Sequence, residues 1–240
     1  FFFVCLFSHE SYGFYMMPAK SNIPSSISSV ATQGAAGAKR VNKRLDATLK
    51  GKQIAFTEAN SFQPVVHSNL LKCYETVDLN GAPQVVVESY LCTLQDRIQE
   101  AAAFRKPLPE SHVLQWFVPI LAGLHQLHSV QRVHGHCYAE ACVFTAHGLK
   151  LGMAHVPEDA RCPAPELSLN QPYTEKSDIW GLGCILFELC TFLLPSADNP
   201  PVEVPTLYSS EMHELVQELL QPKPSQRPSS SVIMKNQFVL

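Results

Sequence analysis

The 240-residue sequence has no apolar run long enough to cross a bilayer, and it carries little net charge. Its longest apolar run, Phe1–Phe7, and shorter runs such as Val85–Val87 fall far short of the ~20 residues that a membrane helix needs. The first run lacks a basic start and a small-residue cleavage site, so we interpret it as a buried strand and not as a signal peptide. A formal charge of −3 favours neither a nucleic-acid nor a membrane-surface partner.

Regular cysteine spacing and internal repeats are also absent. The eight cysteines are scattered, and Cys184 and Cys190 fall inside an apolar helical pattern. We therefore expect free, buried thiols in a reducing compartment, which suggests a cytoplasmic protein and not a disulfide framework. Apolar residues make up 46 % of the chain, enough for a substantial core.

The order of expected elements predicts an α+β fold, with a small strand-rich first part and a larger helical second part. A basic segment from Lys39 to Lys52 is interpreted as the solvated face of a helix, and a docking patch for an acidic partner is the alternative. We expect one domain over residues 1–240, with a first lobe over about 1–88 and a second over 89–240. The expected strands are two within 1–23, then 70–77 and 84–89; the expected helices are 94–104, one from Pro109, 178–192, 211–220 and one from Ser229.

Three stretches carry a resemblance to a known family. They are His67-Ser68-Asn69-Leu70-Leu71, the long run Lys176–Thr191, and Pro224-Ser225-Gln226-Arg227-Pro228-Ser229. In this order they resemble the eukaryotic protein-kinase fold, and the long run is very similar to helix F of the NIMA-related (NEK) serine/threonine kinases. The resemblance covers the chain from about Phe1 to Leu240, and it implies a two-lobed kinase fold.

The resemblance implies architectural roles for several residues. Arg227 is expected to pair with Glu166, which ends an Ala164-Pro165-Glu166 segment like the Ala-Pro-Glu of kinases. Asp178 is expected to hold the backbone of the catalytic loop, and His134 to pack beneath that loop. Glu58 stands nine residues before His67, at the spacing of the helix C glutamate.

The reacting positions depart from the kinase signature, which is His-Arg-Asp-Leu-x-x-x-x-Asn followed by Asp-Phe-Gly. His136 stands in place of the catalytic Asp, and Tyr138 in place of the lysine that contacts the γ-phosphate. Ala141 and Met153 replace the Asn and Asp that hold magnesium. No functional catalytic residue and no metal ligand is therefore expected here.

Two shortened segments point the same way. Only Val156–Pro163 separates Met153-Ala154-His155 from Ala164, which is too short for an activation segment that binds a peptide. Between Thr191 and Pro205 there is almost no room for helix G, which helps to dock substrates in kinases.

A nucleotide pocket, if present, would involve Lys20, Glu58, the gatekeeper Val87, and Glu88 and Tyr90 near the hinge. No glycine-rich phosphate loop is visible, because the chain resembles kinases only from their second strand onward. We therefore expect ATP binding to be weak or absent, magnesium binding to be unlikely on chemical grounds, and no other cofactor. Side chains such as Met153 are expected to fill the pocket.

The sequence thus predicts a pseudokinase, a kinase-like domain that acts as a protein-binding scaffold or an allosteric regulator. Its expected partners are other proteins, with an active kinase or a cytoskeletal component as candidates, and the resemblance implies a cytoskeleton-associated location in the cytoplasm. One alternative is an unusual active serine/threonine kinase in which His136 is the base and Glu140 reaches a metal. Another is a metal site in the crowded loop formed by His134, His136, Cys137, Cys142 and His147.

Overall fold

The computed structural model describes residues 2–8, 11–19, 52–55, 65–79, 82–152, 162–169, 171–195 and 203–240. The predicted site residues Lys20, Glu58 and Met153 lie outside these ranges, as do the basic residues from Lys39 to Lys50. The chain divides into two compact units, Phe1–Lys52 and Gln53–Leu240. The expected single domain, with a lobe boundary near residue 88, stays a prediction.

The first unit contains an antiparallel hairpin, which confirms the two strands expected within residues 1–23. Strand β1 (Phe2–Ser8) pairs with β2 (Ser11–Ala19), and Phe2 lies opposite Ala19. The register shifts between Leu6 and Ser8, at the end of β1.

A second sheet has the strand order β3-β5-β4, formed by β3 (Lys52–Ala55), β4 (Cys73–Leu79) and β5 (Ala82–Glu88). The sequence predicted a strand over residues 70–77. Its predicted start at Leu70 was wrong, because strand β4 begins at Cys73. The backbone of Leu70 and Leu71 lies instead against the end of another strand: the Leu71 N–H donates to the Leu151 carbonyl at 2.8 Å. Because the Asn69 carbonyl and the Leu71 N–H are already paired with the backbone of Leu151, strand β4 starts only at Cys73.

A third sheet, β6-β7-β8, follows directly after the second one in the chain. It contains β6 (Tyr90–Thr93), β7 (Cys142–Thr145) and β8 (Gly148–Leu151), all antiparallel. Gly148 adopts a φ of +110° in the tight turn between β7 and β8, a conformation that side-chain-bearing residues rarely adopt.

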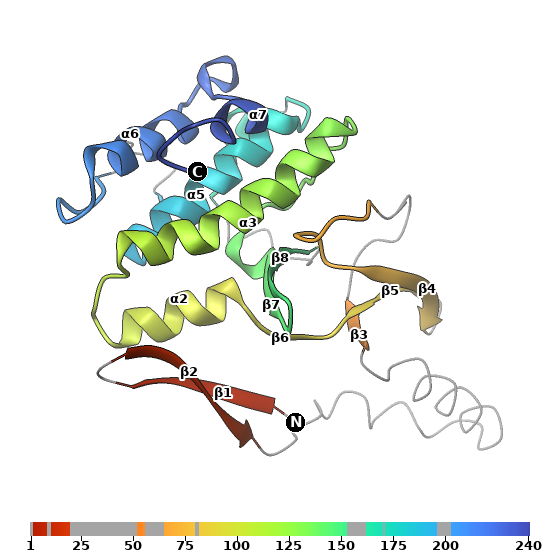
Figure 1. The fold of residues 1–240 in the computed structure, drawn as a ribbon. Helices are drawn as coiled ribbons and strands as arrows, with labels where there is room; N and C mark the ends of the chain where they lie inside the picture. Colours follow the sequence, from red (N-terminus) through yellow and green to blue (C-terminus); the bar gives the residue numbers. More distant parts are fainter. Residues whose placement is uncertain are drawn as a thin grey trace. The chain divides into compact units, whose positions relative to one another are not determined.

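The helices of the described residues all lie in the second unit (Figure 1). Thr93 and Thr174 begin α2 and α5 with reciprocal capping boxes, which satisfy backbone N–H groups that the first helical turn leaves unpaired. Pro109 precedes α3, and this helix runs on through Pro119. The helices are α2 (Leu94–Ala103), α3 (Glu110–Ser129), α4 (Pro165–Ser168), α5 (Glu175–Thr191), α6 (Ser210–Leu219) and α7 (Ser230–Ile233), with short 3₁₀ turns η2 (Ala139–Ala141) and η4 (Pro224–Gln226).

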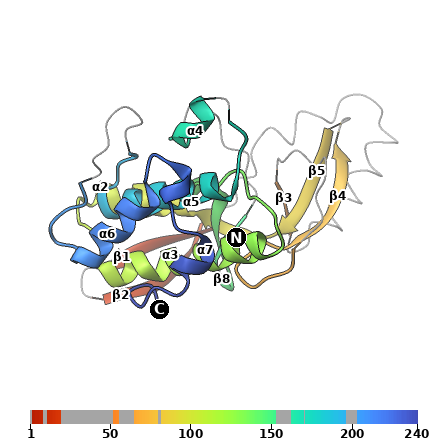
Figure 2. The ribbon, with the colours of Figure 1, turned by 90° about the horizontal axis from the view of Figure 1, so that it is seen from above.

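Helix α5 lies at the centre of the helical part, against α3 and α6 (Figures 1 and 2). Its residues from Ser177 to Cys190 are buried, as its all-round apolar sequence predicts. Full burial of each large aliphatic side chain contributes roughly 1.5–3 kcal/mol, so this helix anchors the core. The fully buried members are Ile179, Leu182, Ile185, Leu186 and Leu189.

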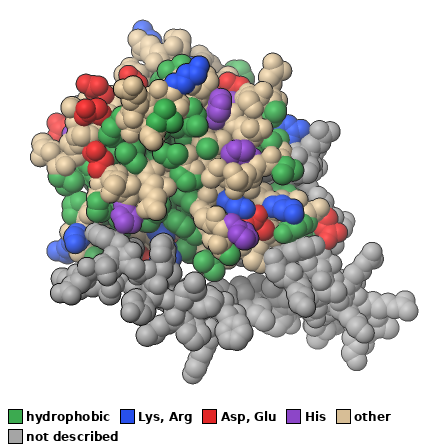
Figure 3. Space-filling model, viewed as in Figure 1, with side chains coloured by type: hydrophobic (Ala, Val, Ile, Leu, Met, Phe, Trp, Pro, Cys, Tyr) green, Lys and Arg blue, Asp and Glu red, His purple; other side chains and the backbone are tan. Residues whose placement is uncertain are grey.

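No helix among the described residues is long and apolar enough to span a membrane. On the face shown in Figure 3, the described lysine and arginine side chains are scattered, and acidic side chains gather over the region of α6. That helix contributes Glu211, Glu214 and Glu218. The cysteines with described side chains are free, as predicted, and Cys137, Cys142, Cys162, Cys184 and Cys190 are buried.

Candidate functional site

Asp178 holds the loop that precedes β7, and it does so from the first turn of α5. Its side chain is fully buried, and it accepts hydrogen bonds from the backbone N–H groups of His134 (2.7 Å) and Gly135 (2.9 Å). The ring Nε2 of His128, on α3, lies 3.0 Å from the same carboxylate. Gly135 has a φ of +83°, so the loop turns sharply where its backbone donates to Asp178.

His134 connects this loop to the end of β8. Its Nε2 lies 2.8 Å from the Gly152 carbonyl, so this nitrogen carries the proton and donates. Its Nδ1 accepts from the backbone N–H of His136 at 3.2 Å. Burial lowers the pKa of His134, and this effect outweighs the negative charge of Asp178, which raises the pKa. The ring is therefore neutral, as a donor at Nε2 and an acceptor at Nδ1 require.

The loop continues through the three described positions at which kinases carry reacting groups. His136 is exposed, Tyr138 is half-buried and Ala141 is fully buried within η2. The Ala141 N–H donates to the Tyr138 carbonyl at 3.0 Å, and the Gly152 N–H donates to the Ala141 carbonyl at 2.8 Å. The loop backbone is thus tied at both ends, while the Ala141 side chain offers only a methyl group.

The residues expected near an adenine site are brought together in part. Val87 is buried and packs with Leu71, Val85 and Val143, and Tyr90 packs against the same cluster. Glu88, the last residue of β5, directs its carboxylate to Lys150 on β8 at 2.7 Å.

The five residues of the suggested metal site do not converge. Among the described residues, no group of three or more histidine, cysteine, aspartate or glutamate side chains has an arrangement that could hold a metal ion. The ring nitrogens of His134 are already used, in hydrogen bonds with the Gly152 carbonyl and the His136 N–H. Burial raises the pKa of the Cys137 and Cys142 thiols well above their usual range, which disfavours the thiolates that zinc requires.

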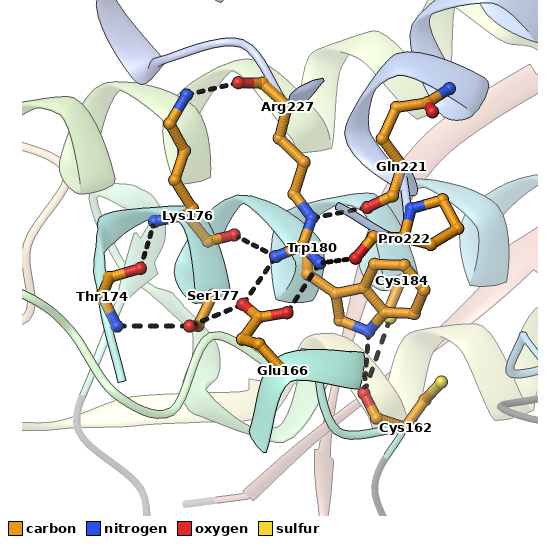
Figure 4. A network of polar contacts seen from close by, with 10 residues as sticks. All are labelled: Cys162, Glu166, Thr174, Lys176, Ser177, Trp180, Cys184, Gln221, Pro222 and Arg227. Carbon is orange, nitrogen blue, oxygen red and sulfur yellow. Dashed lines mark hydrogen bonds and ion pairs between the residues drawn. The ribbon is translucent and has the colours of Figure 1, made fainter. Parts of the chain in front are cut away.

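Arg227 forms a buried ion pair with Glu166, which lies on the short helix α4 (Figure 4). Nη1 and Nη2 of Arg227 each donate to one oxygen of the Glu166 carboxylate, at 2.7 Å in both cases. The hydroxyl of Ser177 donates to the same carboxylate at 2.9 Å. The Arg227 guanidinium lies 5.0 Å from the ring centroid of Trp180, and it donates further to the carbonyls of Gln221, Lys176 and Pro222.

This network fixes the segment that follows the loop. The indole N–H of Trp180 donates to the Cys162 carbonyl at 3.1 Å, so helix α5 also holds the chain just before α4 (Figure 4). Burial alone would raise the pKa of Glu166. The hydrogen bonds from Arg227 and Ser177 lower the pKa by more than burial raises it, so the pKa of Glu166 lies below its usual value. Glu166 is therefore a structural anion and not a proton donor at neutral pH.

Two buried polar contacts in this region were not predicted from the sequence. Ser230 on α7 lies 3.1 Å from His128 Nδ1, which extends the Asp178 contacts to the last helix. Lys150 is the partner of Glu88. A lysine between two buried leucines in a strand signals that an anion must lie nearby, but the sequence does not say which of the acidic residues it is.

Comparison with known proteins agrees with this geometry. Residues 153–239 match the family model described as the protein kinase domain. The chain is 30 % identical over 210 residues to serine/threonine-protein kinase Nek3 of Mus musculus, covering 76 % of this chain and 41 % of Nek3. It is 27 % identical over 220 residues to Nek5 of Homo sapiens, covering 80 % of this chain and 31 % of Nek5. It is 28 % identical over 220 residues to Nek1 of Mus musculus, covering 79 % of this chain and 18 % of Nek1.

The fold and the loop geometry define an α+β domain of the protein-kinase-like class, with a small strand-rich region and a helical C-terminal part. Within that class, the chain is a kinase-like domain related to the Nek serine/threonine kinases. It spans less than half the length of each of these three relatives. The predicted fold class and family resemblance are thus confirmed.

Proposed function

We propose that this domain is a pseudokinase that acts by binding other proteins and does not transfer phosphate. The observation that carries the proposal is the loop from His134 to Ala141. Its backbone is held by Asp178 and Gly152 in a defined geometry, yet Ala141 offers no metal ligand and the base position is His136. A framework kept without the reacting groups supports a role in binding.

The chemistry of phosphoryl transfer explains why these substitutions matter. Magnesium is held by hard oxygen ligands, and it supplies much of the charge stabilisation in the reaction. Ala141 and Met153 carry a methyl group and a thioether, so the side chains at these two positions do not fit a magnesium ion. Loss of a positioned base costs a further factor of roughly 10²–10⁴ in rate.

The proposed partners are proteins, and an active kinase and a cytoskeletal component are the two classes to test first. The relatives bear the name serine/threonine-protein kinase, and this chain corresponds to only part of each. A kinase-like domain with shortened segments after Met153 and after Thr191 has lost surfaces that dock substrate peptides. Its remaining surfaces are therefore proposed to serve stable binding rather than turnover.

A thermal-shift titration with ATP, with and without magnesium, tests this proposal. A ligand at about 100 times its dissociation constant adds roughly 2.7 kcal/mol to the free energy of unfolding, which a melting curve detects readily. We expect the melting temperature to stay unchanged up to millimolar ATP, and an active Nek kinase domain run in parallel to show a shift.

The outcomes separate the proposed function from its alternatives. A shift that requires magnesium, together with phosphate transfer to a general substrate that His136→Ala abolishes, would establish the active-kinase alternative instead. A shift with ATP alone and no transfer would keep the binding role but add nucleotide as a ligand.

A further inference from the structure

The carboxylate of Glu88 accepts three hydrogen bonds from two donors, at the point where two sheets meet. Lys150 Nζ lies 2.7 Å from its Oε1 and 2.9 Å from its Oε2. The backbone N–H of Lys72 donates to Oε2 at 3.1 Å. The side chains of Lys150 and Glu88 are only 11 % and 12 % exposed, so this ion pair is largely shielded from water.

These donors come from separate elements. Glu88 ends β5, Lys150 lies within β8, and Lys72 immediately precedes β4. Backbone hydrogen bonds close the arrangement, because the Glu88 N–H donates to the Lys72 carbonyl at 2.9 Å and the Leu71 N–H donates to the Leu151 carbonyl at 2.8 Å. The ion pair therefore connects the sheet of β4 and β5 to the sheet of β6, β7 and β8.

The covalent connection between these two sheets is very short. Strand β5 ends at Glu88, strand β6 begins at Tyr90, and Ser89 alone lies between them. A one-residue joint leaves the angle between the sheets to be set by contacts across it. The Glu88–Lys150 pair spans this joint, since β8 belongs to the same sheet as β6.

We propose that the Glu88–Lys150 pair is a lock that fixes the angle between these two sheets without any bound ligand. Rotation about Ser89 would separate two shielded charges and leave each one unpaired, which is far more costly than loss of an exposed pair. The lock goes beyond the proposed function, because it holds whether or not the domain binds nucleotide. The angle between the two sheets at Ser89 is therefore set by residues of this chain and does not depend on a ligand.

Hydrogen exchange at single-residue resolution tests the lock through three reporter amides, those of Leu71, Lys72 and Leu151. Two variants weaken the pair: Glu88→Gln keeps the side-chain shape and an acceptor for Lys72, and Lys150→Met removes the cation. Lys223→Met is the matched control, because Lys223 is exposed in the helical part. The amides of Leu182 and Ile185, in the core of α5, report on global unfolding.

We expect each lock variant to speed exchange of the three reporter amides by about tenfold or more, as local opening requires, with the α5 amides unchanged. The control should leave both sets as in the wild type. Reporter amides that exchange at the wild-type rate in the lock variants would overturn the proposal. An equal increase in the exchange rates of the α5 amides would also overturn it, because the pair would then only add to the global stability of the domain. If Lys150→Met does not fold, Glu88→Gln decides the question alone.

Discussion

Replacement of Arg227 by methionine should destabilise the domain more than almost any other single change. The variant keeps most of the volume of the buried stem but removes the donors to Glu166 and to three backbone carbonyls. Removal of one partner from a buried ion pair costs about 3–5 kcal/mol, because the other charge stays buried. For a chain of this size each kcal/mol lowers the melting temperature by about 2–4 °C, so we expect a fall of roughly 6–20 °C.

The assay is urea or thermal unfolding followed by circular dichroism, with a double-mutant cycle. Glu166→Gln should also destabilise, and the double variant should lose less than the sum of the two single losses by about 0.5–3 kcal/mol, since the residues share one network. The exposed Lys235→Met and Glu218→Gln are controls and should change stability by no more than about 0.5 kcal/mol. A loss below about 1 kcal/mol for Arg227→Met, or strict additivity, would refute the reasoning.

The same pair makes a pH-dependent contribution whose sign follows from the lowered pKa of Glu166. Its ordinary value is 4.5, and its folded value lies below that. The stabilisation is therefore fully present above pH 4.5 and is lost as the pH falls through the folded pKa. The stability difference between wild type and Glu166→Gln should shrink over that acidic window, as unfolding titrations at successive pH values can measure.

Two further predictions concern helix α5. Burial raises the pKa of Glu188 to about 6 from 4.5, so this carboxyl favours the folded state below pH 4.5 and loses that contribution as the pH rises through 6. Glu188→Gln keeps the acceptor for Gln95 and should stabilise the domain by about 1–2 kcal/mol at pH 7.5, with no gain at pH 4; an equal gain at both values would contradict this. At Gly181 a Cβ would overlap the Cys137 carbonyl oxygen. Gly181→Ala should therefore cost about 1–3 kcal/mol in urea unfolding, whereas the exposed Gln217→Ala should be nearly neutral, and equal effects would count against close packing of α5 on the loop.

Local sequence signals predicted most elements because each signal acts within a few residues. Apolar residues all round Asp178–Phe192 predicted a buried helix, and the structure has α5 there. Pro109 predicted the start of α3, since its missing N–H costs nothing in the first turn. The start of β4 was misplaced because the backbone of Leu70 and Leu71 pairs with Leu151, about eighty residues away in the chain. No local pattern contains that partner.

The candidate site divides in a similar way. The resemblance placed Asp178 beside the His134 loop and Arg227 beside Glu166, and the structure has both contacts. The roles of Lys20, Glu58 and Met153 stay predictions. The contacts of Ser230 with His128 and of Lys150 with Glu88 lay beyond the sequence, because nothing local distinguishes one distant acidic or hydroxyl group from another.

The chemistry at the reacting positions was determined by the sequence alone. A methyl group at Ala141 and an imidazole at His136 are covalent facts, and no folding can give them the oxygen atoms that magnesium prefers. The tertiary structure decided which buried charges neutralise one another. Lys150 and Glu88 are 62 residues apart, and their pairing depends on how β8 packs beside the end of β5. Burial makes that choice energetically important, because a shielded charge without its partner costs several kcal/mol.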